Sequence, residues 1–284
     1  MKSNNIICSA GFNYCMVQWD GSIFKCYAHN DFKDYSLTKL KIGNIKNKDF
    51  FDLEISPLCE RYCCNEYCDM LGTQQWNNQE LINDSKKMML WPVVEKFEQL
   101  DENNFTVCVD LVSGCQNKCP YCWLTKNKMF DLRHIEGTHW INFIKYISSV
   151  KKGIKFFNIS GLGEPTVHPD FCQIINEALI SDFHVAVTTS ALNLNNKKLK
   201  QILSGLSQKE KNKFSIIISL HPLSPLWSQE KLEELLKEFK NNNYTNIYFN
   251  FVNFSQNMKF KEELIKMGEK YDIKEFRSVD YLDE

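Results

Sequence analysis

The second half of the sequence alternates between short apolar runs and amphipathic stretches, and this alternation restricts the fold more than any other feature. The runs that are typical of β-strands are residues 105–112, 154–160, 183–189, 213–220, 245–252 and 273–279. Between them, apolar residues recur at helical spacing, as in Trp140, Phe143, Ile144 and Ile147. Repeated strand–helix units predict a parallel sheet. Six units fall short of the eight in a closed barrel, so we expect an open α/β fold.

Three cysteines follow the first predicted strand at close spacing. Cys115, Cys119 and Cys122 come directly after Ser113-Gly114, which ends the strand. Three thiolates on a short loop can hold zinc or an iron–sulfur cluster. A zinc site normally needs a fourth cysteine or histidine, which this loop does not supply. A four-iron cluster can instead leave one iron open for a substrate or cofactor. A partial zinc site and a chance grouping of cysteines are the alternatives.

The Cys-x3-Cys-x2-Cys spacing, with the aromatic residue Tyr121 before the last cysteine, resembles the signature of the radical S-adenosylmethionine (radical SAM) superfamily. The resemblance implies a partial (β/α)6 barrel in which the three cysteines hold a 4Fe-4S cluster and S-adenosylmethionine (SAM) chelates the open iron. One electron from the reduced cluster would then break the sulfonium C–S bond. The products would be methionine and a 5′-deoxyadenosyl radical, which abstracts hydrogen from the substrate.

Glycine-rich and polar positions follow the next three predicted strands. Gly161-Leu162-Gly163-Glu164-Pro165 resembles the family's Gly-Gly-Glu-Pro motif, which binds the methionine amino group, although Leu162 interrupts the double glycine. An ordinary strand-to-helix turn is the alternative. Ser190 stands where the family often has asparagine. The resemblance implies these cofactor-binding residues: Tyr121, Gly161, Gly163, Glu164, Pro165, Ser190, Ser219 and His221.

The first 75 residues are rich in cysteine. Of the twelve cysteines in the chain, seven lie here: Cys8, Cys15, Cys26, Cys59, Cys63, Cys64 and Cys68. Disulfides are rare in reducing compartments, so metal or redox chemistry is favoured. Asp20-Gly21 between two apolar stretches predicts a β-hairpin, which would bring Cys15 close to Cys26.

The spacing of Cys8, Gly21 and Cys26 resembles the SPASM or twitch extension, which carries auxiliary 4Fe-4S clusters in many radical SAM enzymes. The extension normally follows the radical SAM domain, whereas here it precedes it. The resemblance implies that Cys8, Cys15, Cys26 and one later cysteine, preferably Cys68, ligate one auxiliary cluster. Cys59, Cys63 and Cys64 remain as further candidates and leave a second cluster open. The alternative is a zinc knuckle built from Cys59, Cys63 or Cys64, and Cys68.

We therefore predict three segments: a SPASM/twitch-like domain over 1–75, a helical connector over 76–104 and a radical SAM partial barrel over 105–284. In the connector, Val93, Val94, Phe97 and Leu100 fall on one face at helical spacing. The net charge of −1 disfavours a broad nucleic-acid footprint. No apolar run is long enough for a membrane span or a signal peptide, so a cytoplasmic location is expected.

The expected activity is that of a radical SAM oxidoreductase or maturase, with an auxiliary cluster that aids substrate oxidation or binding. Modification of a ribosomally made peptide is favoured. A small-molecule alcohol or sugar dehydrogenase, or an epimerase, is the alternative within the class. A non-catalytic iron–sulfur or zinc-binding protein is the alternative outside it, although such a protein would not need Gly163-Glu164-Pro165. An electron donor such as flavodoxin or ferredoxin is the expected protein partner.

Overall fold

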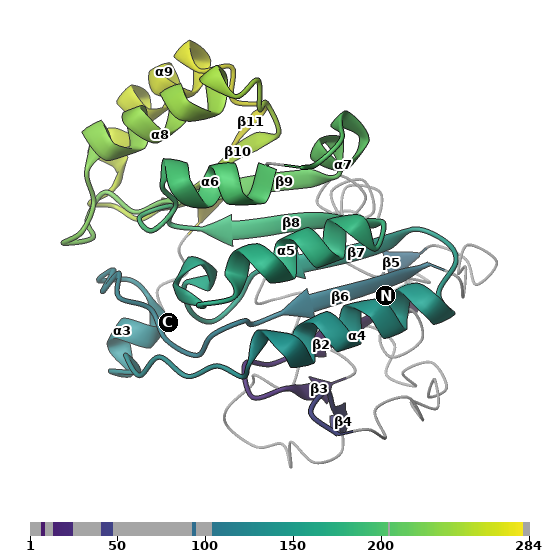
Figure 1. The fold of residues 1–284 in the computed structure, drawn as a ribbon. Helices are drawn as coiled ribbons and strands as arrows, with labels where there is room; N and C mark the ends of the chain where they lie inside the picture. The colour runs from purple at the N-terminus through teal and green to yellow at the C-terminus, as the bar shows by residue number, and fades with distance from the viewer. Residues whose placement is uncertain are drawn as a thin grey trace.

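One continuous sheet organises the described part of the chain. The computed structural model describes residues 7–8, 14–24, 41–47, 93–94, 104–203 and 205–280. Within them, a nine-stranded sheet has the order β11-β10-β9-β8-β7-β6-β2-β3-β4 (Figure 1). A separate two-stranded sheet pairs β1 with β5.

Six parallel strands make up the larger part of this sheet, as the sequence predicted. They are β6 (Phe105–Val109), β7 (Lys155–Ile159), β8 (Phe183–Thr189), β9 (Phe214–Leu220), β10 (Ile247–Asn253) and β11 (Glu275–Asp280). Each pairs in parallel with the next along the chain. Because β11 ends the strand order, the sheet stays open. The predicted α/β fold class is thus confirmed.

Helices follow these strands and cover one face of the sheet (Figure 1). They are α4 (Gly137–Val150), α5 (Phe171–Ile180), α6 (Asn196–Leu203), α7 (Gln208–Asn212), α8 (Gln229–Asn241) and α9 (Lys261–Lys270). Shorter pieces are α3 (Trp123–Lys126) and the 3-10 turns η6 (Pro165–Val167) and η7 (Met258–Phe260). Ser228 caps α8 by accepting the Lys231 backbone N–H, as its position in the sequence predicted.

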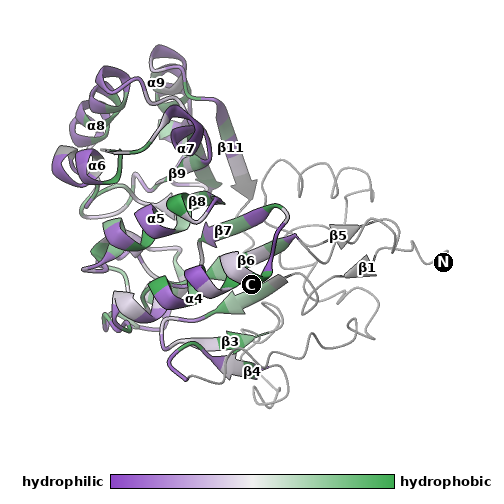
Figure 2. Cartoon of the chain, turned by 45° about the vertical axis from the view of Figure 1, so that its right-hand side comes forward, coloured by the Kyte–Doolittle hydropathy of each residue, from purple (hydrophilic) through white to green (hydrophobic). Residues whose placement is uncertain are grey.

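The hydrophobic core lies between the strands and these helices. Val107 and Phe157 from the sheet and Trp140 and Ile175 from the helices are fully buried in one apolar cluster. Figure 2 shows the helices with polar residues outward and apolar residues toward the sheet. Successive side chains of a strand alternate between faces. Cys108, next to Val107, is therefore on the opposite face and is buried outside that cluster.

The amino-terminal strands extend the same sheet. They are β2 (Tyr14–Val17), β3 (Ser22–Phe24) and β4 (Lys41–Asn44). Strand β2 pairs in parallel with β6, whereas β3 pairs antiparallel with both β2 and β4. The predicted hairpin at Asp20-Gly21 is present, and Gly21 adopts φ +85°, a left-handed conformation that glycine takes without strain. The sequence had given no sign of the β2–β6 pairing.

The connector differs from its prediction at Val93 and Val94. These residues form β5 (Val93–Val94), which pairs antiparallel with β1 (Ile7–Cys8), so they are not helical. Valine is β-branched and favours extended backbone, and here pairing with β1 outweighs the helical spacing. The rest of residues 76–103 lies outside the described part of the chain. The three-segment division remains a prediction.

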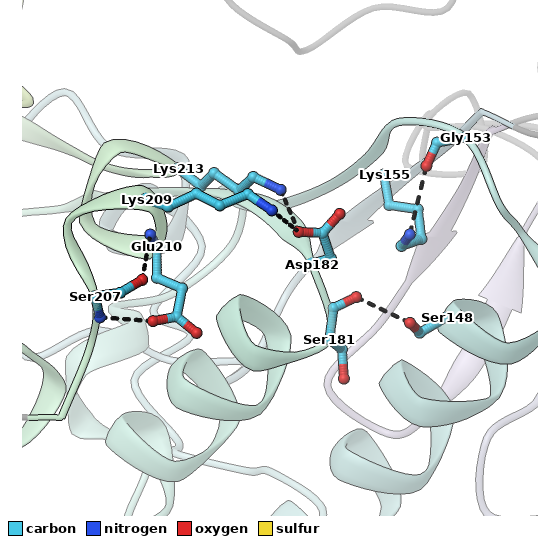
Figure 3. A network of polar contacts seen from close by, with 9 residues as sticks. All are labelled: Ser148, Gly153, Lys155, Ser181, Asp182, Ser207, Lys209, Glu210 and Lys213. Atoms are coloured by element: carbon cyan, nitrogen blue, oxygen red, sulfur yellow. Dashed lines mark hydrogen bonds and ion pairs between the residues drawn. The ribbon is translucent and has the colours of Figure 1, made fainter.

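Polar contacts close the turns at the amino-terminal ends of the parallel strands (Figure 3). Asp182, just before β8, binds the ammonium groups of Lys209 and Lys213, and this holds the pKa of its carboxyl below the usual range. Ser207 and Glu210 form a capping box at the start of α7. Among the described helices, none combines the length and the apolar character that a membrane crossing requires.

Candidate functional site

The carboxyl-terminal ends of β6 to β9 surround one cavity of about 250 Å³. Loops from four different strands line it, as expected for parallel α/β folds. The three loop cysteines contribute to its wall, together with seven of the eight residues predicted to bind the cofactor: Tyr121, Gly161, Gly163, Glu164, Ser190, Ser219 and His221. The eighth, Pro165, begins η6 directly after Glu164. The structure thus brings together the residues that the sequence singled out.

The cysteine loop is held in place by its own backbone and by its neighbours. Cys119 is buried, and Cys115 and Cys122 are half-buried. The Asn117 N–H donates to the Cys115 sulfur over 3.3 Å, and the Cys122 N–H donates to the Cys119 carbonyl over 3.0 Å. The hydroxyl of Ser224, beyond β9, donates to the side-chain carbonyl of buried Asn117. The loop is therefore tied to the segment that follows β9.

The chemistry of the thiols fits an iron–sulfur cluster. Burial raises the pKa of Cys115 to about 11 and that of Cys119 to about 12, and repulsion from neighbouring thiolates adds to both shifts. Such thiols lose their protons when they coordinate a metal. Within the described residues, no three His, Cys, Asp or Glu side chains converge tightly enough to hold a single metal ion. Thiolates are the usual ligands of iron–sulfur clusters, so three of them on one loop fit such a cluster.

The glycine loop after β7 lies directly against the cysteine loop. Gly163 has φ +95°, and a Cβ there would come within 2.4 Å of the Val112 carbonyl oxygen and 2.9 Å of that of Gly114. The Glu164 N–H donates to the same Gly114 carbonyl over 3.1 Å. Only glycine can take this conformation and allow this approach. The two loops therefore form one rigid wall of the cavity.

Glu164 is buried, and both of its carboxylate oxygens are occupied by protein donors. One oxygen accepts from the Thr166 N–H and from the hydroxyls of Thr166 and Thr189, over 3.2, 2.5 and 2.5 Å. The other accepts from the N–H and the hydroxyl of Ser190, over 2.8 and 2.6 Å. The carboxylate therefore links the loop after β7 to the loop after β8, and it shapes the cavity through them.

Tyr121 and His221 meet at another side of the cavity. The Tyr121 hydroxyl and His221 Nδ1 lie 2.7 Å apart and share a hydrogen bond. Burial lowers the pKa of His221 to about 4, so the imidazole is neutral at physiological pH. Burial likewise raises the pKa of Tyr121, which keeps its proton. This side of the cavity therefore offers neutral hydrogen-bonding groups.

Asp110 holds the glycine loop, and the sequence analysis missed it. It follows β6, is 1% exposed, and accepts the Leu162 N–H of the glycine loop over 3.1 Å. Its second carboxylate oxygen has no hydrogen-bond partner, and burial raises the pKa of the carboxyl well above its usual value. An acid at the end of an otherwise apolar strand was the signal that could have revealed it. Thr166 and Thr189, the partners of Glu164, gave no such signal.

The predicted auxiliary ligands are mostly outside the described residues. Cys8 belongs to β1. Cys15 is 2% exposed within the apolar core, and burial together with the neighbouring Cys108 raises the pKa of its thiol. Its surroundings are those of a packing residue. The remaining candidates lie outside the described part of the chain: Cys26, Cys59, Cys63, Cys64 and Cys68.

Two family models match the sequence. The Radical SAM superfamily model matches residues 109–276, which is more than half of the chain. The SPASM model, described as an iron-sulfur cluster-binding domain, matches residues 8–109 and so precedes the other match. No curated protein sequence matches the chain.

Solved structures share the fold at low sequence identity. SuiB from Streptococcus suis, bound to its precursor peptide SuiA, has a TM-score of 0.51 at 14% identity, over 99% of this chain and 63% of that one. Native anSMEcpe with bound AdoMet has a TM-score of 0.50 at 18% identity, over 63% of this chain and 52% of that one. This chain therefore spans about half to three-fifths of the length of these proteins.

Proposed function

Because the chain belongs to the radical SAM superfamily, we propose that it cleaves SAM reductively and uses the resulting 5′-deoxyadenosyl radical to abstract hydrogen from a substrate. The family and the SPASM match together assign it SAM and iron–sulfur clusters as cofactors. The observation that carries the proposal is the convergence of Cys115, Cys119 and Cys122 with the glycine loop on one cavity. A bound four-iron cluster supplies the electron that breaks the sulfonium C–S bond.

The protein's own contribution is to hold and shield the reactants. Cys115, Cys119 and Cys122 would ligate the cluster. The Glu164 carboxylate already accepts hydrogen bonds from protein groups on both oxygens. The backbone of Gly161 to Gly163 would therefore bind the methionine amino group. Neutral His221 and Ser219 would offer hydrogen bonds to the ribose or carboxylate of SAM. The buried wall of the cavity limits access of water to the radical.

We favour a peptide as the substrate and an oxidoreductase or maturase reaction. The fold likeness to SuiB, whose structure holds a precursor peptide, and the SPASM match support this choice. An auxiliary cluster near the substrate could accept an electron from a substrate radical or bind the substrate at an open iron. Product formation that depends on a peptide would support the choice, whereas turnover of free alcohols or sugars would contradict it.

The first test is an anaerobic assay without substrate. The reconstituted protein is mixed with SAM and dithionite, and 5′-deoxyadenosine is measured. We expect slow formation that disappears in the Cys115→Ala/Cys119→Ala/Cys122→Ala variant. No product from a wild-type protein that contains clusters and binds SAM in a titration, with or without candidate peptides, would contradict the proposal.

A further inference from the structure

Exposed apolar side chains gather in one short stretch after α3. Met129, Phe130 and Leu132 are 41%, 37% and 50% exposed. They are three of the eight large apolar side chains that are exposed in the described part of the chain; the other five are scattered over other elements. Exposed apolar side chains that gather in one stretch are a feature of interaction sites.

This stretch is fixed against the cysteine loop. A Cβ on Gly114 would come within 2.6 Å of the Asp131 carbonyl oxygen, so the two backbones are in close contact. Ser113 donates its hydroxyl to that carbonyl over 2.8 Å and accepts the Arg133 N–H over 3.0 Å. The ammonium of Lys118, the residue before Cys119, lies 5.2 Å from the centre of the Phe130 ring. The apolar surface is thus an outer flank of the loop that carries the three cysteines.

The same surface is positively charged. Residues 118–133 contain four cations, Lys118, Lys126, Lys128 and Arg133, and a single acid, Asp131. All four cations are exposed. Asp131 lies 3.1 Å from Arg133 and so offsets only part of this charge. Four cations and one acid give residues 118–133 a net charge of +3, whereas the whole chain has a net charge of −1. A basic rim around apolar side chains complements an acidic protein surface.

We propose that residues 126–133, with Lys118, form the docking surface for an acidic one-electron donor protein of the flavodoxin or ferredoxin type. This inference rests on the proposed function, because each SAM cleaved reductively consumes one electron. The donor loses that electron, a flavin hydroquinone becoming a semiquinone, and the electron enters at the iron–sulfur group ligated by the neighbouring cysteines. Residues 126–133 do not line the cavity that is assigned to SAM, whereas Lys118 does, so this flank of the loop is left for the donor.

The test compares two reductants on the reconstituted holoenzyme. Flavodoxin, kept reduced by its reductase, must dock, whereas dithionite need not. The charge-reversal variant Lys126→Glu/Lys128→Glu should lower flavodoxin-supported 5′-deoxyadenosine formation at least about tenfold at low ionic strength. Its activity with dithionite should equal that of the wild type. The matched control, Lys152→Glu/Lys266→Glu, makes the same charge change at exposed positions on other elements and should behave as wild type with both reductants.

A binding measurement gives a readout that is independent of SAM cleavage. The affinity of the holoenzyme for flavodoxin should fall by a similar factor in the charge-reversal variant, and high salt should bring the wild type to the same level. Met129→Ser/Leu132→Ser should weaken binding at high salt as well, because it removes apolar contact rather than charge.

Two results would overturn the inference. One is flavodoxin binding that stays unchanged in Lys126→Glu/Lys128→Glu and in Met129→Ser/Leu132→Ser. This would mean that the donor docks elsewhere or that another part of the chain covers this surface. The other is an equal loss of activity with both reductants, which would mean that the stretch supports the cysteine loop. A wild-type protein without activity in dithionite would contradict the proposed function instead, and the affinities would still decide the docking surface.

Discussion

Ser190 donates both its backbone N–H and its hydroxyl to the same carboxylate oxygen of Glu164, over 2.8 and 2.6 Å. The pair joins the ends of two neighbouring parallel strands. The hydroxyl and the N–H of one serine thus donate to a single oxygen from two directions. The geometry of the cavity wall then depends on a negative charge that is 2% exposed.

Replacing Glu164 by Gln should break hydrogen bonds that join the loop after β7 to the loop after β8. An amide nitrogen would face donors where a carboxylate oxygen now accepts from them, and buried hydrogen bonds to a charged group contribute about 1.5–3 kcal/mol each. We expect Glu164→Gln to lower the free energy of unfolding by about 3 kcal/mol and to weaken SAM binding more than tenfold. Thermal denaturation and a SAM titration measure the two effects. Glu262→Gln, on an exposed face of α9, should change neither.

A comparison of Gly163→Ala with Gly205→Ala distinguishes the effect of close contact from that of backbone strain. The new methyl group would meet the Val112 carbonyl oxygen at 2.4 Å, and backbone cannot move aside cheaply. SAM binding should therefore be lost. Gly205→Ala is the matched control, because Gly205 also has positive φ, +84°, but open space around it. That variant should cost about 1 kcal/mol of stability from strain and leave SAM binding intact. Equal SAM affinity in both variants would show that the loops are not packed as described.

Asp110→Asn should make the stability of the protein less sensitive to alkaline pH. An unfolded Asp has a pKa near 3.9, whereas burial raises the folded pKa of Asp110. The folded state therefore holds a proton that the unfolded state has lost, and stability falls as pH rises from about 4 through the folded pKa. Asparagine can still accept the Leu162 N–H but does not titrate.

The measurement is urea unfolding of the metal-free, reduced protein at pH 5 and pH 8. Between these values, the wild type should lose stability relative to Asp110→Asn, because only the wild type has a buried carboxyl that gives up its proton on unfolding. Parallel pH dependence of the two proteins would mean that Asp110 is ionised in the folded state.

Cys15→Ala tests which role this thiol has. The sequence resemblance made Cys15 an auxiliary ligand, whereas its place in the apolar core is that of a packing residue. We expect the variant to lose about 1 kcal/mol of stability and to keep the iron content of the wild type after reconstitution. Cys26→Ala, at the position that matches the SPASM spacing, should lose about four irons. A loss of four irons in Cys15→Ala would instead show that Cys15 ligates an auxiliary cluster.

The sequence predicted the parallel strands well because their signal is local and repeated. Each of the six strands has a run of apolar residues, and each following helix has an apolar face such as Trp140 to Ile147. The turn at Gly21 was predictable for the same reason, because a short motif determines it. The cysteine and glycine loops could be placed together because the ends of parallel strands share one edge of a sheet.

Contacts between distant residues could not be predicted in this way. The partners of Glu164 are 2 to 26 positions away, and hydroxyl groups such as those of Thr166 and Thr189 are common on any surface. Helical spacing at Val93 and Val94 was misleading because strand pairing with β1, far along the chain, decides their conformation. The parallel pairing of β2 with β6 also joins segments about ninety residues apart.

That β2–β6 pairing has a consequence for any attempt to study residues 105–284 by themselves. Strand β6 leads into the cysteine loop, and it hydrogen-bonds to β2 on one side and to β7 on the other. A protein shortened to residues 105–284 would leave the β2 side of β6 as a bare sheet edge, open to pairing with other molecules. Expressed alone, residues 105–284 would tend to self-associate through the strand that leads into the cysteine loop.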